Sequence, residues 1–322
     1  VYKRQDLGGA HRVFQLCGPG LASSFPPVRT LDLTPNNLPS QVSELLGRER
    51  ELAELRSTID GRSTRLITLI GPGGTGKTRL GLHVAADQID RYADGVYLID
   101  LANVTDAQGV APALARVVAA DERSEDPPAV VVARAIGSRS ILLLLDNFEH
   151  VLTAGTMIAG LLAACENMMV IVTSREALHV RGEQVYDVAP LGLPPPGDIP
   201  SVDAAMQHEA IELFVARAAA VDPSFTIDEA NVADIVAICR RLDGLPLAIE
   251  LAAARLRLFH PAELRERLDE RLDLLRGGAA DLPERQRALM STIEWSYYLL
   301  TVHKRSLFRA FSAFAGASLD SV

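Results

Sequence analysis

The stretch LITLIGPGGTGKTRL, residues 66–80, decides the fold of this chain. Its first five residues have the apolar, β-branched character of a buried strand, and a helical pattern follows the lysine. Between them lies a glycine-rich turn that matches G-x-x-x-x-G-K-[ST] in the strand-to-helix setting that this motif requires. The sequence therefore predicts a phosphate-binding loop over residues 71–78.

Each part of the loop is expected to have its own chemical role. Glycines allow backbone conformations closed to other residues, so that successive N–H groups bind phosphate oxygens, and the helix N-terminus adds its positive end. Lys77 is expected to reach the β- and γ-phosphates, and the Thr78 hydroxyl is expected to bind Mg²⁺. The predicted contacts of the nucleotide in this segment are Gly71, Pro72, Gly73, Gly74, Thr75, Gly76, Lys77, Thr78 and Arg79.

A second half of the site is expected at ILLLLDNFEH, residues 141–150. Asp146 follows five aliphatic residues, which places it at the carboxyl edge of a buried strand, where open α/β sheets bind ligands. A lone aspartate at such a position commonly forms a turn, but beside a phosphate loop it favours a magnesium ligand. Thr78 and Asp146 are thus the predicted metal ligands.

The residue after this aspartate bears on the rate of hydrolysis. Many motor ATPases carry an acidic residue there as general base, whereas Asn147 has an amide that cannot accept a proton at neutral pH. Glu149 or His150 could substitute as base, or both could simply begin a solvated helix. Asn147 favours slow hydrolysis, which suits a switch better than a motor.

An arginine follows another apolar run, MMVIVTS at residues 168–174. Arg175 could be an ordinary surface residue, but at the same sheet edge it could reach a γ-phosphate. Lys77, Asp146 and Arg175 are therefore the predicted catalytic residues.

The alternation of short apolar runs with helical patterns predicts the architecture. LITLI, VYLIDL, ILLLLD and MMVIVTS read as strands of a parallel α/β sheet that is flanked by helices, with the fold of a P-loop NTPase. Residues 1–40 are expected to be a linker or the tail of a preceding domain, and residues 41–192 the nucleotide-binding domain. The proline-rich segment at 190–200 reads as a stiff spacer or a polyproline ligand, and a small helical domain is expected over 193–280.

Composition limits the classes of function. The chain has 322 residues, and 48% of them are hydrophobic. Its formal charge is −9 and its pI is about 5.3, so a uniformly basic nucleic-acid surface is not expected. Apolar runs such as Met157–Cys165 are shorter than the ~20 residues that span a bilayer. Cys17, Cys165 and Cys239 are far apart, which favours reduced thiols and a cytoplasmic location.

Several stretches together resemble the NB-ARC or STAND class of signal-transduction ATPases, in particular a bacterial branch found in multidomain transcriptional regulators. The resemblance covers about residues 38–322. It rests on LLGRERELAEL, GPGGTGKTRL, LLLLDNFEHV, VTSREAL, ICRRLDGLPLAIELAAARL and LPERQRALMSTIEWSYYLL.

This resemblance implies that the cofactors are ATP or ADP together with Mg²⁺. It also implies further contacts with the nucleotide. Gly47, Arg48 and Glu49 would border the adenine, and the Gly-Leu-Pro at 244–246 would place Pro246 against the base. Pro246 also reads as the first residue of a helix.

The two ends of the chain resemble parts of larger proteins. Residues 281–322 are similar to the start of a winged-helix module, in which Trp295 would be a core residue. The segment before residue 40 is similar to a junction that follows a class III nucleotide cyclase, although a DNA-binding or kinase-like module upstream stays open. Because the chain starts at Val1 rather than methionine, we expect it to be a fragment.

Together these patterns predict a nucleotide-operated switch with slow magnesium-dependent ATP hydrolysis. The alternatives are a ring-forming ATPase with steady turnover and a small-molecule kinase, and the kinase is disfavoured because no lid or acceptor pocket is evident. The expected partners are the nucleotide and either a second copy or effector domains outside this segment. Contact with a membrane, or of this segment with DNA, is not expected.

Overall fold

A computed structural model of the chain describes residues 34–39, 45–61, 64–120, 124–197 and 200–270, with Arg305, Ser306 and Arg309. The predicted start of a winged-helix module, with Trp295, lies outside these residues apart from those three isolated positions. Most of the predicted linker over 1–40 lies outside them as well.

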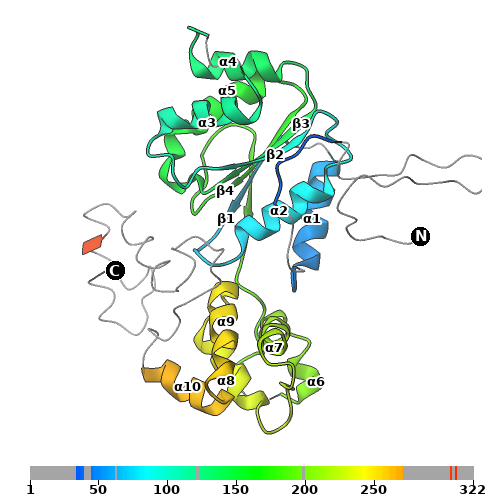
Figure 1. The fold of residues 1–322 in the computed structure, drawn as a ribbon, viewed down its shortest axis with the longest axis vertical. Helices are drawn as coiled ribbons and strands as arrows, with labels where there is room; N and C mark the ends of the chain where they lie inside the picture. Colours follow the sequence, from blue (N-terminus) through cyan, green and yellow to red (C-terminus); the bar gives the residue numbers. More distant parts are fainter. Residues whose placement is uncertain are drawn as a thin grey trace, which may run out of the picture. The chain divides into compact units, whose positions relative to one another are not determined.

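A five-stranded parallel sheet forms the centre of the region that was predicted to bind a nucleotide (Figure 1). Its strands lie in the order β2-β3-β4-β1-β5, so β4 separates the strand before the glycine-rich loop from the strand that ends in Asp146. Strands buried on both faces need apolar residues throughout, which is why these runs were recognisable. The predicted α/β class is confirmed. The strands are β1 (Leu66–Ile70), β2 (Val96–Asp100), β3 (Ile141–Asp146), β4 (Met168–Thr173) and β5 (Glu183–Asp187).

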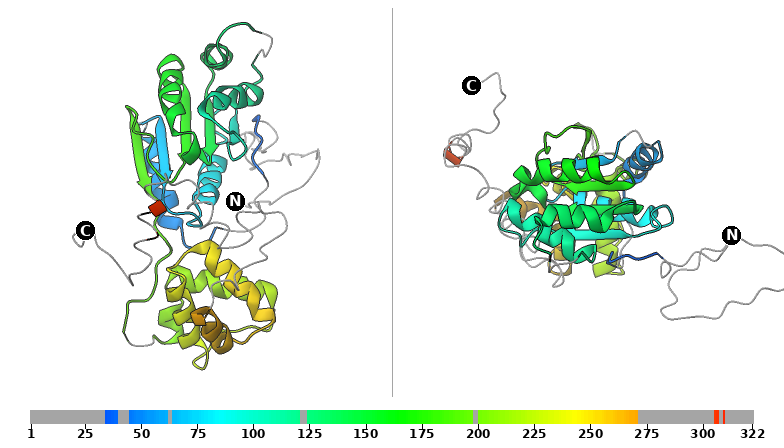
Figure 2. Two further views of the ribbon diagram at one scale, coloured as in Figure 1. Left: turned by 90° about the vertical axis from the view of Figure 1, so that its left-hand side faces the viewer. Right: turned by 90° about the horizontal axis from the view of Figure 1, so that it is seen from above.

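Helices cover both faces of the sheet, and the further views in Figure 2 show the same elements from the side and from above. Successive side chains of a strand point to opposite faces. Leu142 and Leu144 of β3 therefore pack in one core cluster with α1 and α2, whereas Leu143 and Leu145 join the other cluster with α3, α4 and α5. These helices are α1 (Glu49–Asp60), α2 (Lys77–Asp87), α3 (Val110–Val117), α4 (Pro128–Ile136) and α5 (Gly155–Ala164).

The strand β5 is absent from the predicted strands. Its sequence EQVYD has acidic residues at both ends and no continuous apolar run. It pairs with β1 alone at the edge of the sheet and is only partly buried, so it needs none of the apolar character that marks the central strands.

The helices that come after the sheet in the sequence have a hydrophobic core of their own. Ile211, Phe214, Ile238 and Ile249 are fully buried in this cluster, which also includes Leu191. The predicted helical part of the fold is confirmed, whereas its limits at 193 and 280 stay predictions. Its helices are α6 (Val202–Ala205), α7 (Glu209–Val221), α8 (Val232–Arg241), α9 (Pro246–Ala253) and α10 (Pro261–Glu270).

Helix length bears on membrane insertion. Within the residues that the structure describes, no helix is both long enough and apolar enough to cross a bilayer. The longest α-helix there, α7, has 13 residues.

A segment of the predicted linker lies along the free edge of β2. The Val96 amide donates to Pro35 O at 3.0 Å, and Asn36 forms a parallel bridge with Val96. Asn37 Nδ2 donates to Leu98 O at 2.9 Å, and Asn37 Oδ1 accepts from the Leu98 amide at 2.6 Å. The Asn37 side chain thus satisfies both backbone groups of Leu98, as a neighbouring strand would.

We predict that Asn37→Ala lowers the free energy of unfolding by about 1 kcal/mol, since it removes two hydrogen bonds that water partly replaces. Asn36→Ala is the control, because the Asn36 amide donates to the nearby Thr34 carbonyl. Urea denaturation measures both variants. Equal stability of the two would mean that Asn37 does not hold the segment on the sheet.

Candidate functional site

The loop between β1 and α2 has the backbone that its glycines were expected to permit. Gly71 has φ 146°, and a Cβ there would lie 2.7 Å from Val188 O. Gly76 has φ 91° in the left-handed region and directly precedes α2. A side chain at either position would be strained or would collide, so the glycines are required for this turn.

Arg48 binds the backbone of the glycine-rich loop through its side chain. Its guanidinium is buried and donates to Thr75 O at 3.1 Å and to Ala189 O at 2.6 Å. It also pairs with Glu51 at 2.7 Å. The preceding Gly47, with φ 69°, packs against Glu209 so closely that a Cβ would lie 2.6 Å from the Glu209 Cβ. Arg48 and Gly47 thus have structural contacts of their own, and their predicted contact with adenine stays a prediction.

Lys77 places a positive charge inside the loop. Its Nζ donates to Gly71 O at 2.7 Å and to Pro72 O at 2.8 Å. Burial lowers the pKa of Lys77 to about 8; Arg175 acts in the same direction, whereas Glu149 and Asp146 oppose it. Most of the ammonium therefore stays protonated at pH 7 and can attract an anion.

Asp146 is the point at which separate elements meet. Its Oδ1 accepts from the Thr78 hydroxyl at 2.7 Å and from the Thr173 hydroxyl, and its Oδ2 accepts from Asn147 Nδ2 at 2.8 Å. Burial raises the pKa of Asp146 and the nearby carboxylates of Asp100 and Glu149 add to this, while the two hydroxyl hydrogen bonds oppose it. The structure thus brings together Thr78 and Asp146, the predicted metal ligands.

Asn147 joins two carboxylates. It adopts φ 64°, a left-handed conformation that asparagine tolerates. Its backbone N–H donates to Thr173 Oγ1 at 3.0 Å. Its Nδ2 donates to Asp100 Oδ1 and to Asp146 Oδ2, both at 2.8 Å. Asp100 and Thr173 were not among the predicted site residues. Each lies one residue before the end of a predicted strand, so both could have been placed at this edge with Asp146.

Arg175 and Glu149 form an ion pair beside this cluster. Arg175 Nε donates to Glu149 Oε1 at 3.2 Å, and both side chains are largely buried. His150 Nε2 lies 2.7 Å from Val104 O and 3.0 Å from Leu101 O, so this nitrogen faces backbone carbonyls. Of the two alternative bases, Glu149 is the one that lies beside Asp146 and Asn147, and its Oε1 already accepts a hydrogen bond from Arg175.

The helix α9 contacts the glycine-rich loop. Leu247 N donates to Gly74 O at 3.3 Å, one residue after Pro246. Arg79 Nη1 and Arg217 Nε both donate to Glu250 Oε1, at 2.9 and 3.1 Å. The predicted contact residues Gly74, Arg79 and Pro246 are thus brought close together, and their contact with a nucleotide stays a prediction.

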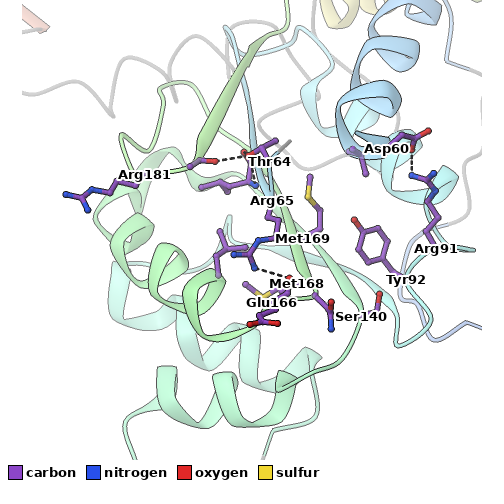
Figure 3. Close-up of a pocket in the computed structure, with 15 residues that line it drawn as sticks. Asp60, Thr64, Arg65, Arg91, Tyr92, Ser140, Glu166, Met168, Met169 and Arg181 are labelled. Carbon is purple, nitrogen blue, oxygen red and sulfur yellow. Dashed lines mark hydrogen bonds and ion pairs between the residues drawn. The ribbon is translucent and has the colours of Figure 1, made fainter. Parts of the chain in front are cut away.

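A pocket of about 540 Å³ lies at the opposite edge of the sheet (Figure 3). It is lined by the residues at which β1 and β4 begin. Arg65 donates to Cys165 O at 2.8 Å, Arg91 pairs with Asp60, and the Arg181 side chain extends away from the other labelled residues. Ligands of open parallel sheets bind at the carboxyl ends of strands, so we assign the functional site to the loop and not to this pocket.

The sheet, the glycine-rich loop and the aspartate at the end of β3 define a P-loop NTPase fold. No protein-family model matches the sequence. The chain is similar to "Putative HTH-type transcriptional regulator Rv0890c" of Mycobacterium tuberculosis, with 40% identity over 253 residues that cover 78% of this chain and 27% of that protein.

Other relatives extend the similarity. "Uncharacterized protein Rv0894" of Mycobacterium tuberculosis is 34% identical over 276 residues, or 85% of this chain and 66% of that protein. Regulatory protein AfsR of Streptomyces coelicolor is 28% identical over 313 residues, or 90% of this chain and 28% of AfsR. The chain thus spans about a quarter of the length of the regulators it matches.

Solved structures show more distant similarity. A STAND protein with a tetratricopeptide repeat sensor from Pyrococcus horikoshii has a TM-score of 0.40 and 17% identity, covering 90% of this chain and 37% of that one. The ORC2 protein of Aeropyrum pernix has a TM-score of 0.46 and 12% identity, covering 70% of this chain and 68% of that one. At these TM-scores neither structure bears on function.

We predict that Thr173→Val lowers the free energy of unfolding by about 1–3 kcal/mol, because Asp146 loses a donor and the Asn147 amide loses its acceptor in a buried position. Thr68→Val on β1 is the matched control, since the buried Thr68 hydroxyl has no hydrogen-bond partner among the residues that the structure describes. Urea denaturation should show little or no loss for the control. A Thr173→Val variant as stable as wild type would contradict the assignment of the hydroxyl.

Proposed function

We propose that this chain is an ATP- and ADP-binding molecular switch of a signalling or transcription-regulating protein, with slow magnesium-dependent ATP hydrolysis. The observation that carries the proposal is the 2.7 Å hydrogen bond from Thr78 to Asp146. It joins the first turn of the loop helix to the end of β3, so the hydroxyl and the carboxylate can serve one ion.

The donor set fits Mg²⁺. A hydroxyl and a carboxylate are hard oxygen ligands, and Mg²⁺ typically takes one or two such protein ligands together with substrate phosphates and water. Thr78 and Asp146 would hold the ion, which would neutralise charge on the phosphates. The backbone of the loop and Lys77 would bind the phosphates themselves.

The surroundings of Asp146 favour slow hydrolysis. Asn147 donates its amide to two carboxylates, and Glu149 already accepts from Arg175. A general base needs a free acceptor within reach of the attacking water. The Asn147 amide cannot take a proton, and one carboxylate oxygen of Glu149 is engaged by Arg175, which supports a switch over a ring-forming ATPase with steady turnover.

The relatives support a regulatory role. They include "Putative HTH-type transcriptional regulator Rv0890c" and regulatory protein AfsR, and this chain spans about a quarter of the length of each. We therefore place the output of the switch in segments outside this chain, or in a second copy of it.

The first test is Lys77→Ala, which we expect to weaken binding of both ADP and ATP at least ~10-fold, since a charge-assisted contact is worth roughly 1.5–3 kcal/mol. Isothermal titration measures the affinities. Arg181→Ala is the control, because it removes a positive charge at the opposite edge of the sheet. Unchanged affinity in a folded Lys77→Ala variant would exclude the loop as the phosphate site.

The second test is Asp146→Asn, which we expect to weaken binding of ATP in Mg²⁺ but to leave binding of ADP in EDTA nearly unchanged. The reason is that the carboxylate acts through the ion. Titrations with and without the metal measure the difference. Equal losses in both conditions would make Asp146 a structural residue only.

The third test is the rate of turnover in the wild-type chain. Ordinary enzymes turn over at about 10 per second, and we expect this chain to stay well below ~1 per second. Phosphate release under saturating ATP and Mg²⁺ measures the rate. Faster turnover would favour the ring-forming ATPase.

A further inference from the structure

The ion pair between Glu149 and Arg175 lies next to the phosphate loop. Glu149 is on a short 3-10 turn, Phe148–His150, that the fully buried Phe148 anchors after β3. Arg175 follows β4, the neighbouring strand. Their side chains are 10% and 19% exposed, and both interact electrostatically with the Lys77 ammonium. A negative charge and a tethered arginine thus border the place assigned to the phosphates.

We propose that Glu149 holds Arg175 away from a third phosphate and thereby makes the site prefer ADP over ATP. This proposal rests on the proposed nucleotide site. Glu149 is then a residue that determines specificity, rather than the base of hydrolysis.

The preference follows from what each nucleotide demands of the pair. A γ-phosphate adds negative charge near Glu149 and Asp146. It competes with Glu149 for the Arg175 guanidinium, so we expect an arginine that moves onto the phosphate to release Glu149. The released carboxylate is 10% exposed and would be left without its partner, which is unfavourable in a poorly solvated position. ADP makes no such demand, so the pair can persist when ADP is bound.

The alternative role of Glu149 as general base makes a different prediction. Loss of a base slows hydrolysis and leaves the relative affinity for ATP and ADP unchanged. Loss of a tether changes that relative affinity. The two roles can therefore be separated by one set of variants.

The experiment measures the dissociation constants of ADP and of a non-hydrolysable ATP analogue for the full chain in Mg²⁺. In Glu149→Gln we expect the ratio of the ATP-analogue constant to the ADP constant to fall about tenfold, as Arg175 becomes free to bind the third phosphate. Glu176→Gln is the control, since it removes an exposed negative charge next to Arg175 and should leave the ratio unchanged.

A second variant distinguishes the holding of Arg175 by Glu149 from simple repulsion between the Glu149 charge and the γ-phosphate. It also keeps the proposal testable if Glu149→Gln does not fold. Glu149→Asp keeps the charge but shortens the side chain by one C–C bond, about 1.5 Å. The 3.2 Å contact with Arg175 would then be lost, and we expect the ratio to fall here too.

The outcomes are distinct. An unchanged ratio in Glu149→Gln, or a change in Glu149→Gln that is absent in Glu149→Asp, would overturn the tether. Slower single-turnover hydrolysis at an unchanged ratio would assign Glu149 as the base and also overturn it. A wild-type chain that binds neither nucleotide would overturn the proposed function and this inference with it, whereas normal ADP binding with unchanged ratios would overturn the inference alone.

Discussion

The hydrogen bonds to the Asp146 carboxylate are the constraint on which the site depends. A buried carboxylate needs partners, and here they come from α2, from β4 and from the turn after β3. These contacts fix the start of the loop helix relative to β3 and β4, of which β4 lies next to β1 in the sheet. The glycines allow the conformation of the loop, and Arg48 hydrogen-bonds to the loop backbone at Thr75. Asp146 sets where the helix after the loop begins relative to the carboxyl ends of the strands.

The same loop is also a contact surface for the helical part of the chain. Leu247 meets Gly74, and Glu250 joins Arg79 of the loop helix to Arg217 of α7. A ligand that changes the position of Arg79 or of the Gly74 carbonyl must therefore change contacts made by α7 and α9. This shared use of groups is the physical basis on which a nucleotide could alter the helical region, as a switch requires.

Sequence alone could predict the elements whose physics is local. The bounds of β1 and β3 agree with the runs LITLI and ILLLLD, because strands buried on both faces must be apolar, and the loop is specified by its glycines, Lys77 and Thr78. Pairings between distant segments could not be predicted. The bridge from Asn147 to Asp100 and the pairing of Glu149 with Arg175 depend on the strand order, which periodicity does not reveal. The strand β5 was missed because an edge position relaxes the demand for apolar residues.

A crystal structure of the chain with Mg²⁺ and a non-hydrolysable ATP analogue would test the central claim most directly. The account predicts that the phosphates lie on the backbone of residues 71–78 beside Lys77. It also predicts that the metal is bound by the Thr78 hydroxyl and by Asp146, directly or through one water. Phosphates bound elsewhere, or a metal out of reach of Asp146, would contradict it.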